Sequence, residues 1–279
     1  MAIVDQPPAR GPSGIGVRAV RTLGELLITA GVVVLLFVVY ELYVTNLSSA
    51  GKQADATATL DQDWADDGRQ LHPELIDGKA FAKLHIPAFG ADYHFTIQEG
   101  TSAAALEIGP GHYRGTALPG EPGNFAVAGH RVGKGAPFND LDLLASCDAI
   151  VIETQTDFFV YRVLPRPDEI GGWAAGKGTR PQCAHVSTLR TNAADGGPYG
   201  GTSGREVVGA GEVSVISPVP HQPADLLPKV QQVALLTLTT CHPRFSDRQR
   251  LIVHAMLTNQ YAKTPGSIYQ QLLQSIGET

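Results

Sequence analysis

Between residues 80 and 258, short apolar runs alternate with segments rich in Gly, Pro, Asn and Asp. The runs are too short for most helices and contain many β-branched and aromatic residues, which is typical of β-strands. Eight strands are therefore expected, at 81–86, 93–97, 124–128, 149–153, 158–164, 212–217, 233–240 and 250–258. Eight short strands with turn signals between them predict a mostly β domain over 79–260, folded as a closed barrel or a sandwich.

One segment breaks this alternation. Residues 168–211 form a long stretch with many glycines and no clear strand pattern. Loops of this length are uncommon inside compact domains and are often functional or disordered. After the last expected strand, residues 261–279 are expected to form a tail or a short helix, because apolar positions between 266 and 276 recur with helical spacing.

A different pattern precedes the β domain. Residues 26–40 are an uncharged apolar run of 15 residues, and the wider segment 22–45 carries acids only near its two ends. As a helix rising ~1.5 Å per residue, this segment is long enough to cross the hydrocarbon core of a bilayer. We therefore expect a single transmembrane helix that contacts the lipid bilayer through 22–45. Two alternatives remain open, a signal peptide cleaved near Ser48-Ser49-Ala50 and a buried core helix.

The charges on either side of that segment predict its orientation. Arg10, Arg18 and Arg21 precede it against a single acid, whereas acidic residues dominate the stretch that follows. Because positively charged flanks stay in the cytoplasm, residues 1–21 are expected to be a disordered cytoplasmic tail, with the β domain outside the cell membrane. Residues 46–78 are polar and acidic, and are expected to be an extracytoplasmic linker or a frayed helix.

Composition narrows the class of protein. The chain has 279 residues, 43% of them hydrophobic and 17% charged, which fits one moderate globular domain with extensions. The formal net charge of −6 argues against a surface that binds nucleic acid. The sequence contains no Cys-x-x-Cys, no His-x-x-x-His and no EF-hand loop, so we expect no metal site and no cofactor.

Three cysteines are present: Cys147, Cys183 and Cys241. An odd count in an exported protein suggests one disulfide and one free thiol. If Cys241 is the reactive thiol, Cys147 and Cys183 are the natural pair, and a bridge across their 36-residue separation would constrain the unfolded chain. The alternative is that these two cysteines are buried and unpaired.

Candidate chemistry lies at the ends of the last two expected strands. Cys241 follows the strand at 233–240, and Arg250 begins the next strand nine positions later. In a hairpin these positions come close together, and a fixed cation favours the ionised form of a thiol. A free cysteine is more often a buried core residue. The polar, arginine-bearing segment after Cys241 favours the reactive interpretation, with Arg248 as the alternative to Arg250.

A histidine stands at the end of another expected strand. The strand at 124–128 runs into Gly129 and then His130, and a glycine there lets the backbone turn and leaves the imidazole unobstructed. Imidazole is the side chain best suited to exchange protons near neutral pH. His242 adjoins Cys241, but neighbouring residues on an extended chain point to opposite faces, so it is the poorer partner.

These motifs resemble the signatures of the sortase family. Thr237-Leu-Thr-Thr-Cys241, with an arginine at the start of the next strand, matches the cysteine signature of that family. Residues 120–131 look like its histidine-bearing strand. The sequences of residues 111–120 and 136–141 are similar to those of class E sortases of actinobacteria.

The resemblance covers about residues 81–257 and implies an eight-stranded β-barrel with the activity of a thiol transpeptidase of the hydrolase class. Such enzymes cleave a sorting signal between Thr and Gly, and class E members are associated with Leu-Ala-x-Thr-Gly. The implied partners are secreted proteins with a C-terminal sorting signal and an amine of the peptidoglycan precursor. The 168–211 segment is longer than the compact pattern of the family, which leaves the shape of the substrate groove open.

The resemblance also implies roles for individual residues. Cys241 is the expected nucleophile, His130 the general acid and base, and Arg250 the group that stabilises the oxyanion. Thr240 and Tyr113 are candidate substrate-binding residues. Three other functions remain open: a hydrolytic cysteine peptidase, a membrane-anchored β-barrel that only binds, and a sortase that polymerises pilins.

Overall fold

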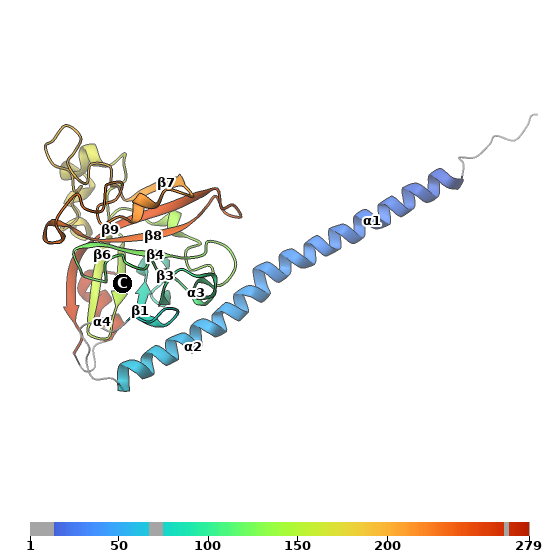
Figure 1. The fold of residues 1–279 in the computed structure, drawn as a ribbon, viewed down its shortest axis with the longest axis horizontal. Helices are drawn as coiled ribbons and strands as arrows, with labels where there is room; N and C mark the ends of the chain where they lie inside the picture. Colours follow the sequence, from blue (N-terminus) through green and yellow to red (C-terminus); the bar gives the residue numbers. More distant parts are fainter. Residues whose placement is uncertain (1–13, 67–74, 265–267, 279) are drawn as a thin grey trace, which may run out of the picture. The chain divides into compact units, whose positions relative to one another are not determined.

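The computed structural model describes residues 14–66, 75–264 and 268–278. The chain divides into two units, Met1–Val44 and Thr45–Thr279. The second unit contains a β-barrel with helices packed against it (Figure 1).

The first unit is largely one apolar helix. Helix α1 spans Gly14–Val39 and is followed by a π-helical stretch at Tyr40–Val44. Within α1, the 24 residues Gly16–Val39 have a mean hydropathy of 2.4 and are long and apolar enough to cross a membrane. The helix overlaps the expected segment 22–45 but begins inside the range expected to be a disordered tail. The rest of that tail, residues 1–13, lies outside the described residues.

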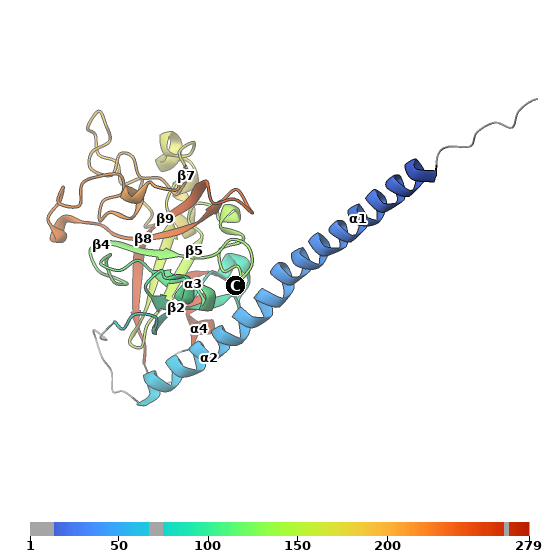
Figure 2. The same cartoon turned by 45° about the vertical axis from the view of Figure 1, so that its right-hand side comes forward.

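A closed barrel forms the body of the second unit (Figures 1 and 2). The strand order is β6-β5-β1-β2-β3-β4-β8-β9, and pairing of β9 with β6 closes the ring. A ninth strand, β7, pairs with β9 alone. The expected eight-stranded barrel is therefore confirmed over the sandwich. The strands are β1 (Ala80–His85), β2 (His94–Glu99), β3 (Gly111–His112), β4 (Gly123–Ala128), β5 (Ala149–Glu153), β6 (Asp157–Val163), β7 (Arg205–Gly209), β8 (Ala234–His242) and β9 (Gln249–Ala262).

Alternate residues of the strands fill the barrel. On β8, Leu236 and Leu238 are fully buried in the main hydrophobic core. Because successive side chains of a strand point to opposite faces, Thr237, Thr239 and Cys241 lie on the outer face of the barrel wall. The alternation of apolar and polar residues in β8 thus separates the core from the face that carries the thiol.

Two strands differ from the sequence prediction. The prediction of a strand at 212–217 is wrong, because Val213–Ile216 forms a 3-10 helix. The side chain of Glu212 caps its N-terminus by accepting a hydrogen bond from the Ser214 N–H. The eighth strand of the barrel is instead β3, which spans only Gly111–His112. A strand of two residues is too short to produce a periodic pattern in the sequence.

The range expected to be a long loop, 168–211, is made of short turns and ends in β7. Three 3-10 helices occupy its first part. A disulfide joins Cys147 to Cys183, with the two Cα atoms 5.1 Å apart, so the expected pair is present and Cys241 is free. The bridge packs with Trp173 and attaches this segment to the barrel just before β5.

The range 46–78, expected to be a linker or a frayed helix, forms an ordered helix over much of its described part. Helix α2 spans Thr45–Asp66 and packs against β1 and β2, with Ser49 and Leu60 buried. Residues 67–74 of the expected linker lie outside the described residues. The contact face of α2 contains small and polar residues, so the apolar period that normally predicts a packed helix is weak.

Gln53 attaches α2 to the barrel wall. Its Nε2 donates to the Thr96 carbonyl (3.0 Å), and its Oε1 accepts from the Thr96 N–H (2.8 Å). Thr96 is fully buried on β2, and the pairing of β2 with β3 begins only at Gln98. One side-chain amide therefore satisfies the backbone groups that a neighbouring strand would otherwise satisfy.

The two remaining α-helices are short. Helix α3 (Ala103–Ile108) connects β2 to β3, and Ser102 caps its N-terminus by accepting the Ala105 N–H. Helix α4 (Tyr269–Ile276) lies in the range 261–279, where a tail or a short helix was expected. Its Leu272 packs against β5 and β6 in a second hydrophobic cluster on the barrel.

Candidate active site

Strand register pairs two of the three candidate residues and brings the end of β4, which leads to the third, beside β8. Cys241 and Arg250 are direct partners in the antiparallel β8–β9 pair. In the parallel β4–β8 pair, Ala128 is the last paired residue and lies opposite Thr239. Continuing this register by two residues, as the Gly129–Thr239 hydrogen bond supports, places His130 next to Cys241. Partners in a sheet point to the same face. With the register continued in this way, positions 130, 241 and 250 form one row on the outer face of the barrel.

Two hydrogen bonds extend the β4–β8 contact beyond the last paired residues. The Gly129 N–H donates to the Thr239 carbonyl (3.1 Å). The Thr240 hydroxyl donates to the Gly129 carbonyl (2.8 Å). The backbone that carries His130 is thus fixed to the strand that carries Cys241.

A glycine is required at position 129 because the Phe138 ring lies close to its backbone, and not because of an unusual backbone angle. A Cβ atom at this position would lie 2.5 Å from the ring of Phe138. That ring is fully buried and belongs to the main core. From the sequence we expected Gly129 to permit a tight turn, whereas in the structure the packing of Phe138 requires a residue without a side chain.

His130 is half-buried, and its Nε2 is buried without a hydrogen-bond partner among the described residues. Burial lowers the pKa of His130 below its usual value, and the positive charge of Lys134 lowers it further, while Glu107 acts in the opposite direction. The neutral ring is therefore favoured near neutral pH. A neutral imidazole can accept a proton from an amine or a thiol, and its imidazolium is a strong proton donor.

Arg250 differs from the other arginines near the thiol in its partners. Its Nη1 donates to the carbonyls of Asp247 (2.7 Å) and Gln249 (3.0 Å). No carboxylate pairs with it among the described residues. The charge of the guanidinium, opposite Cys241 in the sheet, is therefore not offset by a paired carboxylate of the described residues. Arg248 is exposed and precedes β9, outside the row of candidate side chains.

By contrast, Arg131 and Arg244 are neutralised by acids. Arg131 is buried, lies 3.0 Å from Asp142, and contacts His242 Nδ1 at 2.8 Å. Arg244 pairs with Asp140 at 3.1 Å. His242 is thereby directed to Arg131, which agrees with the expectation that it is a poor partner for Cys241.

The two candidate substrate-binding residues are placed differently from each other. Thr240 is buried, and its hydroxyl is occupied by the Gly129 carbonyl, so it positions the His130 backbone and is not available to a peptide. Tyr113 is half-buried, and its hydroxyl lies 2.9 Å from the Thr239 hydroxyl on the face of Cys241. Thr239 was not singled out from the sequence, although its position two residues before Cys241 places it on the same face.

Comparison with known proteins identifies a family. The sortase domain model matches residues 84–258. Sortase SrtE1 of Streptomyces coelicolor is 34% identical over 94% of this chain, and this chain spans 63% of that relative's length. Sortase SrtE2 of the same organism is 38% identical over 65% of this chain and 79% of its own. These relatives agree with the resemblance to class E sortases.

Two solved structures support the assignment to the sortase family. The SrtF sortase from Corynebacterium diphtheriae superposes with a TM-score of 0.59 and 44% sequence identity, covering 72% of this chain and 94% of its own. The SrtA sortase from Actinomyces oris gives a TM-score of 0.52 at 28% identity, covering 73% and 93%.

Proposed function

The chain belongs to the sortase family, and from this membership we propose that it is a cysteine transpeptidase that attaches secreted proteins to the cell wall. Its substrates carry a C-terminal sorting signal of the Leu-Ala-x-Thr-Gly or Leu-Pro-x-Thr-Gly type, which is cut between Thr and Gly. The acceptor is an amine of the peptidoglycan precursor. The observation that carries the proposal is the pairing of Cys241 with Arg250 across β8 and β9, next to the end of β4 that leads to His130.

In the first half-reaction, the Cys241 sulfur attacks the carbonyl carbon of the Thr residue. A bond from Sγ to carbon forms, and the bond from that carbon to the Gly nitrogen breaks. His130 accepts the thiol proton of Cys241 as the sulfur attacks, and then gives that proton to the departing amine. The product is a thioester, which splits a difficult amide exchange into two easier steps.

In the second half-reaction, the acceptor amine attacks the thioester carbon. His130, now neutral, takes a proton from that amine as the new carbon–nitrogen bond forms and the carbon–sulfur bond breaks. The lowered pKa of His130 supports this role, because the neutral ring is the form that accepts a proton.

Arg250 stabilises the charge that develops in both steps. The oxygen of the scissile carbonyl becomes negative in each tetrahedral intermediate, and a fixed cation contributes most where water is excluded. The guanidinium supports this role because no carboxylate of the described residues neutralises it. Tyr113, held by Thr239 on the same face, is the nearest candidate for a contact with the peptide.

A ligation assay tests the proposal. The full chain is incubated with a Leu-Ala-x-Thr-Gly peptide, with and without triglycine, and the products are measured by mass spectrometry. We expect a ligated product that requires triglycine, and none from Cys241→Ala. His94→Ala is a control with an exposed histidine that retains activity. Cleavage without ligation would identify a hydrolytic peptidase, and unchanged peptide with intact Cys241 would favour a binding module.

We also propose that α1 anchors the protein in the cell membrane as a single pass, with its N-terminus in the cytoplasm and the barrel outside. The apolar segment Gly16–Val39 supports the span, and Arg10 in the preceding tail supports the orientation. Membrane fractionation and the intact mass of the mature protein test this. We expect the protein in the membrane fraction to have an intact mass that includes residues 1–50. A mature chain that begins near Ala50 would identify a cleaved signal peptide.

A further inference from the structure

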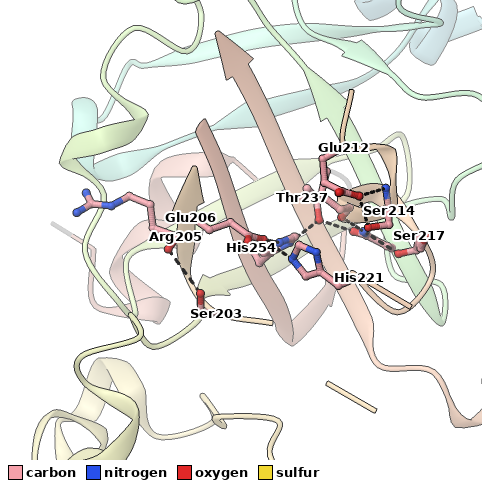
Figure 3. A network of polar contacts seen from close by, with 11 residues as sticks. Ser203, Arg205, Glu206, Glu212, Ser214, Ser217, His221, Thr237 and His254 are labelled. Carbon is pink, nitrogen blue, oxygen red and sulfur yellow. Dashed lines mark hydrogen bonds and ion pairs between the residues drawn. The ribbon is translucent and has the colours of Figure 1, made fainter. Parts of the chain in front are cut away.

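A second cluster of reactive side chains lies on the outer wall of the barrel (Figure 3). It joins Glu206 of β7, His254 of β9 and His221 of the segment that follows the 3-10 helix Val213–Ile216. The Glu206 Oε1 atom lies 2.7 Å from His221 Nε2 and 3.0 Å from His254 Nε2. All three ligand-type atoms lie within 4.8 Å of one another, and His254 is fully buried.

The hydrogen bonds behind His254 determine which of its nitrogens carries a proton. Asn124 Nδ2 donates to the carbonyls of Val215 (3.2 Å) and Ser217 (3.1 Å), so its Oδ1 is the acceptor. That oxygen takes the hydroxyl hydrogen of Thr237 (2.7 Å). Having donated its hydrogen, Thr237 Oγ1 accepts from His254 Nδ1, which lies 2.8 Å away.

This arrangement points the Nε2 lone pair of a neutral His254 at a carboxylate. Two acceptors that face each other at 3.0 Å repel, unless a proton or a cation lies between them. The second imidazole, His221, meets the same oxygen of Glu206. The two imidazole nitrogens and the carboxylate oxygen lie within 4.8 Å of one another and are a common ligand set for zinc.

We propose that Glu206, His221 and His254 bind a divalent transition metal ion of the zinc class. In zinc sites an imidazole ligand typically donates its other N–H to an outer partner, which fixes its tautomer, and Thr237 occupies that place for His254. With bonds of about 2.0–2.1 Å, tetrahedral ligand atoms are about 3.3 Å apart, so each histidine nitrogen moves about 0.3–0.6 Å away from the Glu206 oxygen. A water completes the coordination.

The position of the site indicates a structural role. His254 is four residues beyond Arg250 on β9, which corresponds to about 13 Å along the strand, so the ion is not in reach of the reacting carbonyl. The ion joins β7, β9 and the His221 segment on the face that carries Cys241. His221 has a φ of 66°, an unfavourable angle for a side chain, and coordination holds it there.

We expected no metal site from the sequence because it contains no metal-binding motif with local spacing. The three ligands are at positions 206, 221 and 254, on segments that only the fold brings together. No short motif in the sequence could have revealed them. The proposal concerns a site separate from the cysteine and does not depend on the transpeptidase activity.

Cobalt titration tests the site directly. The full chain in detergent is stripped with a chelator and titrated with Co²⁺, whose visible bands report tetrahedral coordination, and Zn²⁺ is then added as a competitor. We expect saturation at one equivalent and complete displacement by Zn²⁺. If the stripped wild-type chain binds neither ion, and NMR finds both nitrogens of His254 protonated, the cluster is held by protons and the proposal is overturned.

Variants separate this site from accidental binding. His221→Ala and Glu206→Gln remove a ligand and should abolish the tetrahedral bands. Thr237→Val keeps every ligand but removes the outer hydrogen bond, and should weaken binding by about 10–100-fold. His185→Ala, an exposed histidine elsewhere, is the matched control and should bind as wild type. Equal binding by His221→Ala and wild type would contradict the assignment, whatever the ligation assay finds.

Discussion

At the scale of single residues, the candidate site depends on which charges near the thiol remain available. Arg131 and Arg244 contact acids, whereas Arg250 donates only to carbonyls of its own turn among the described residues. Register places Arg250 opposite Cys241, while Arg248 precedes the strand. The difference between these arginines is therefore one of position and pairing, not of residue type.

This difference predicts the outcome of arginine replacements. Arg250→Lys keeps the charge but loses the planar fork that can hold a carbonyl oxygen, and should lower kcat/KM for ligation by about 100-fold. Arg248→Lys is the matched control and should retain most of the activity. Steady-state kinetics with the sorting peptide measures both. A large loss in Arg248→Lys with a mild effect in Arg250→Lys would reverse the assignment of the oxyanion group.

The charges around His130 lead to a second prediction. Lys134 lowers the pKa of His130 and Glu107 raises it, so removing each charge should move that pKa in opposite directions. In NMR titrations of the ring, Lys134→Gln should raise the pKa of His130 and Glu107→Gln should lower it. The wild-type pKa should be below the usual 6.5, because burial disfavours the imidazolium. Shifts of the same sign in both variants would exclude this electrostatic account.

At the scale of elements, α2 completes the barrel wall where β3 is too short. The amide of Gln53 satisfies both backbone groups of Thr96, and the Thr57 hydroxyl lies 2.6 Å from the Thr96 hydroxyl. The helix that follows the apolar segment is thus part of the folded domain. The Gly135 N–H also donates to Asn46 Oδ1 (3.0 Å), which connects α2 to the loop that follows His130.

Removing this amide should destabilise the barrel. Gln53→Ala leaves a buried N–H and a buried carbonyl of Thr96 without their partner, and should lower the free energy of unfolding by about 1–3 kcal/mol. Gln62→Ala, exposed on the same helix, should change it little. Urea unfolding of the two variants provides the comparison. If both variants have the same free energy of unfolding as the wild type, α2 is not needed to complete the wall.

The elements differ in how well the sequence predicted them. Seven of the expected strands correspond to barrel strands, because alternation of apolar and polar residues has a local cause. Residues 212–217 contain similar apolar residues, but the side chain of Glu212 caps the residues that follow it, and they form a 3-10 helix in place of a strand. β3 and α2 were not predicted as barrel-wall elements, because their places depend on partners distant in the chain, such as Thr96 for Gln53.

At the scale of the whole molecule, the residues of the site that could be proposed from the sequence are those with a recognisable local position or residue count. Cys241, His130 and the disulfide pair stood out by position or by count. The burial of Thr240, the Tyr113–Thr239 contact and the Glu206 cluster depend on which strands are neighbours. Strand order is set by contacts across the entire fold, and no local pattern contains it.

A buried cluster that joins β1, β5 and the end of β9 links protonation to overall stability. Glu153 contacts His85 Nε2 at 2.9 Å and accepts from Lys263 Nζ at 2.7 Å. Burial alone would raise the pKa of Glu153, but the hydrogen bonds from His85 and Lys263 outweigh it and lower the pKa to about 2. A lowered pKa stabilises the fold above the usual value of 4.5, and this stability is lost as the pH falls toward 2.

This cluster predicts a specific pH dependence. At neutral pH, Glu153→Gln should lower the free energy of unfolding by about 3 kcal/mol, and its stability should fall less than that of the wild type on acidification. Glu121→Gln, which loses only a partly exposed pair with Lys229, should lose less than about 1 kcal/mol. Urea unfolding across the acid range measures both. Parallel pH profiles for Glu153→Gln and wild type would contradict the prediction.

The central claim is that the Cys241 sulfur, flanked by His130 and Arg250, carries the acyl group of a sorting peptide. Intact-protein mass spectrometry after incubation with a Leu-Ala-x-Thr-Gly peptide, followed by peptide mapping, tests it most directly. We predict a mass increase equal to the peptide up to its Thr, located on Cys241, absent in Cys241→Ala and reversed by triglycine. The claim would be contradicted if Cys241→Ala still cleaved the peptide between Thr and Gly, or if the adduct were on a different residue.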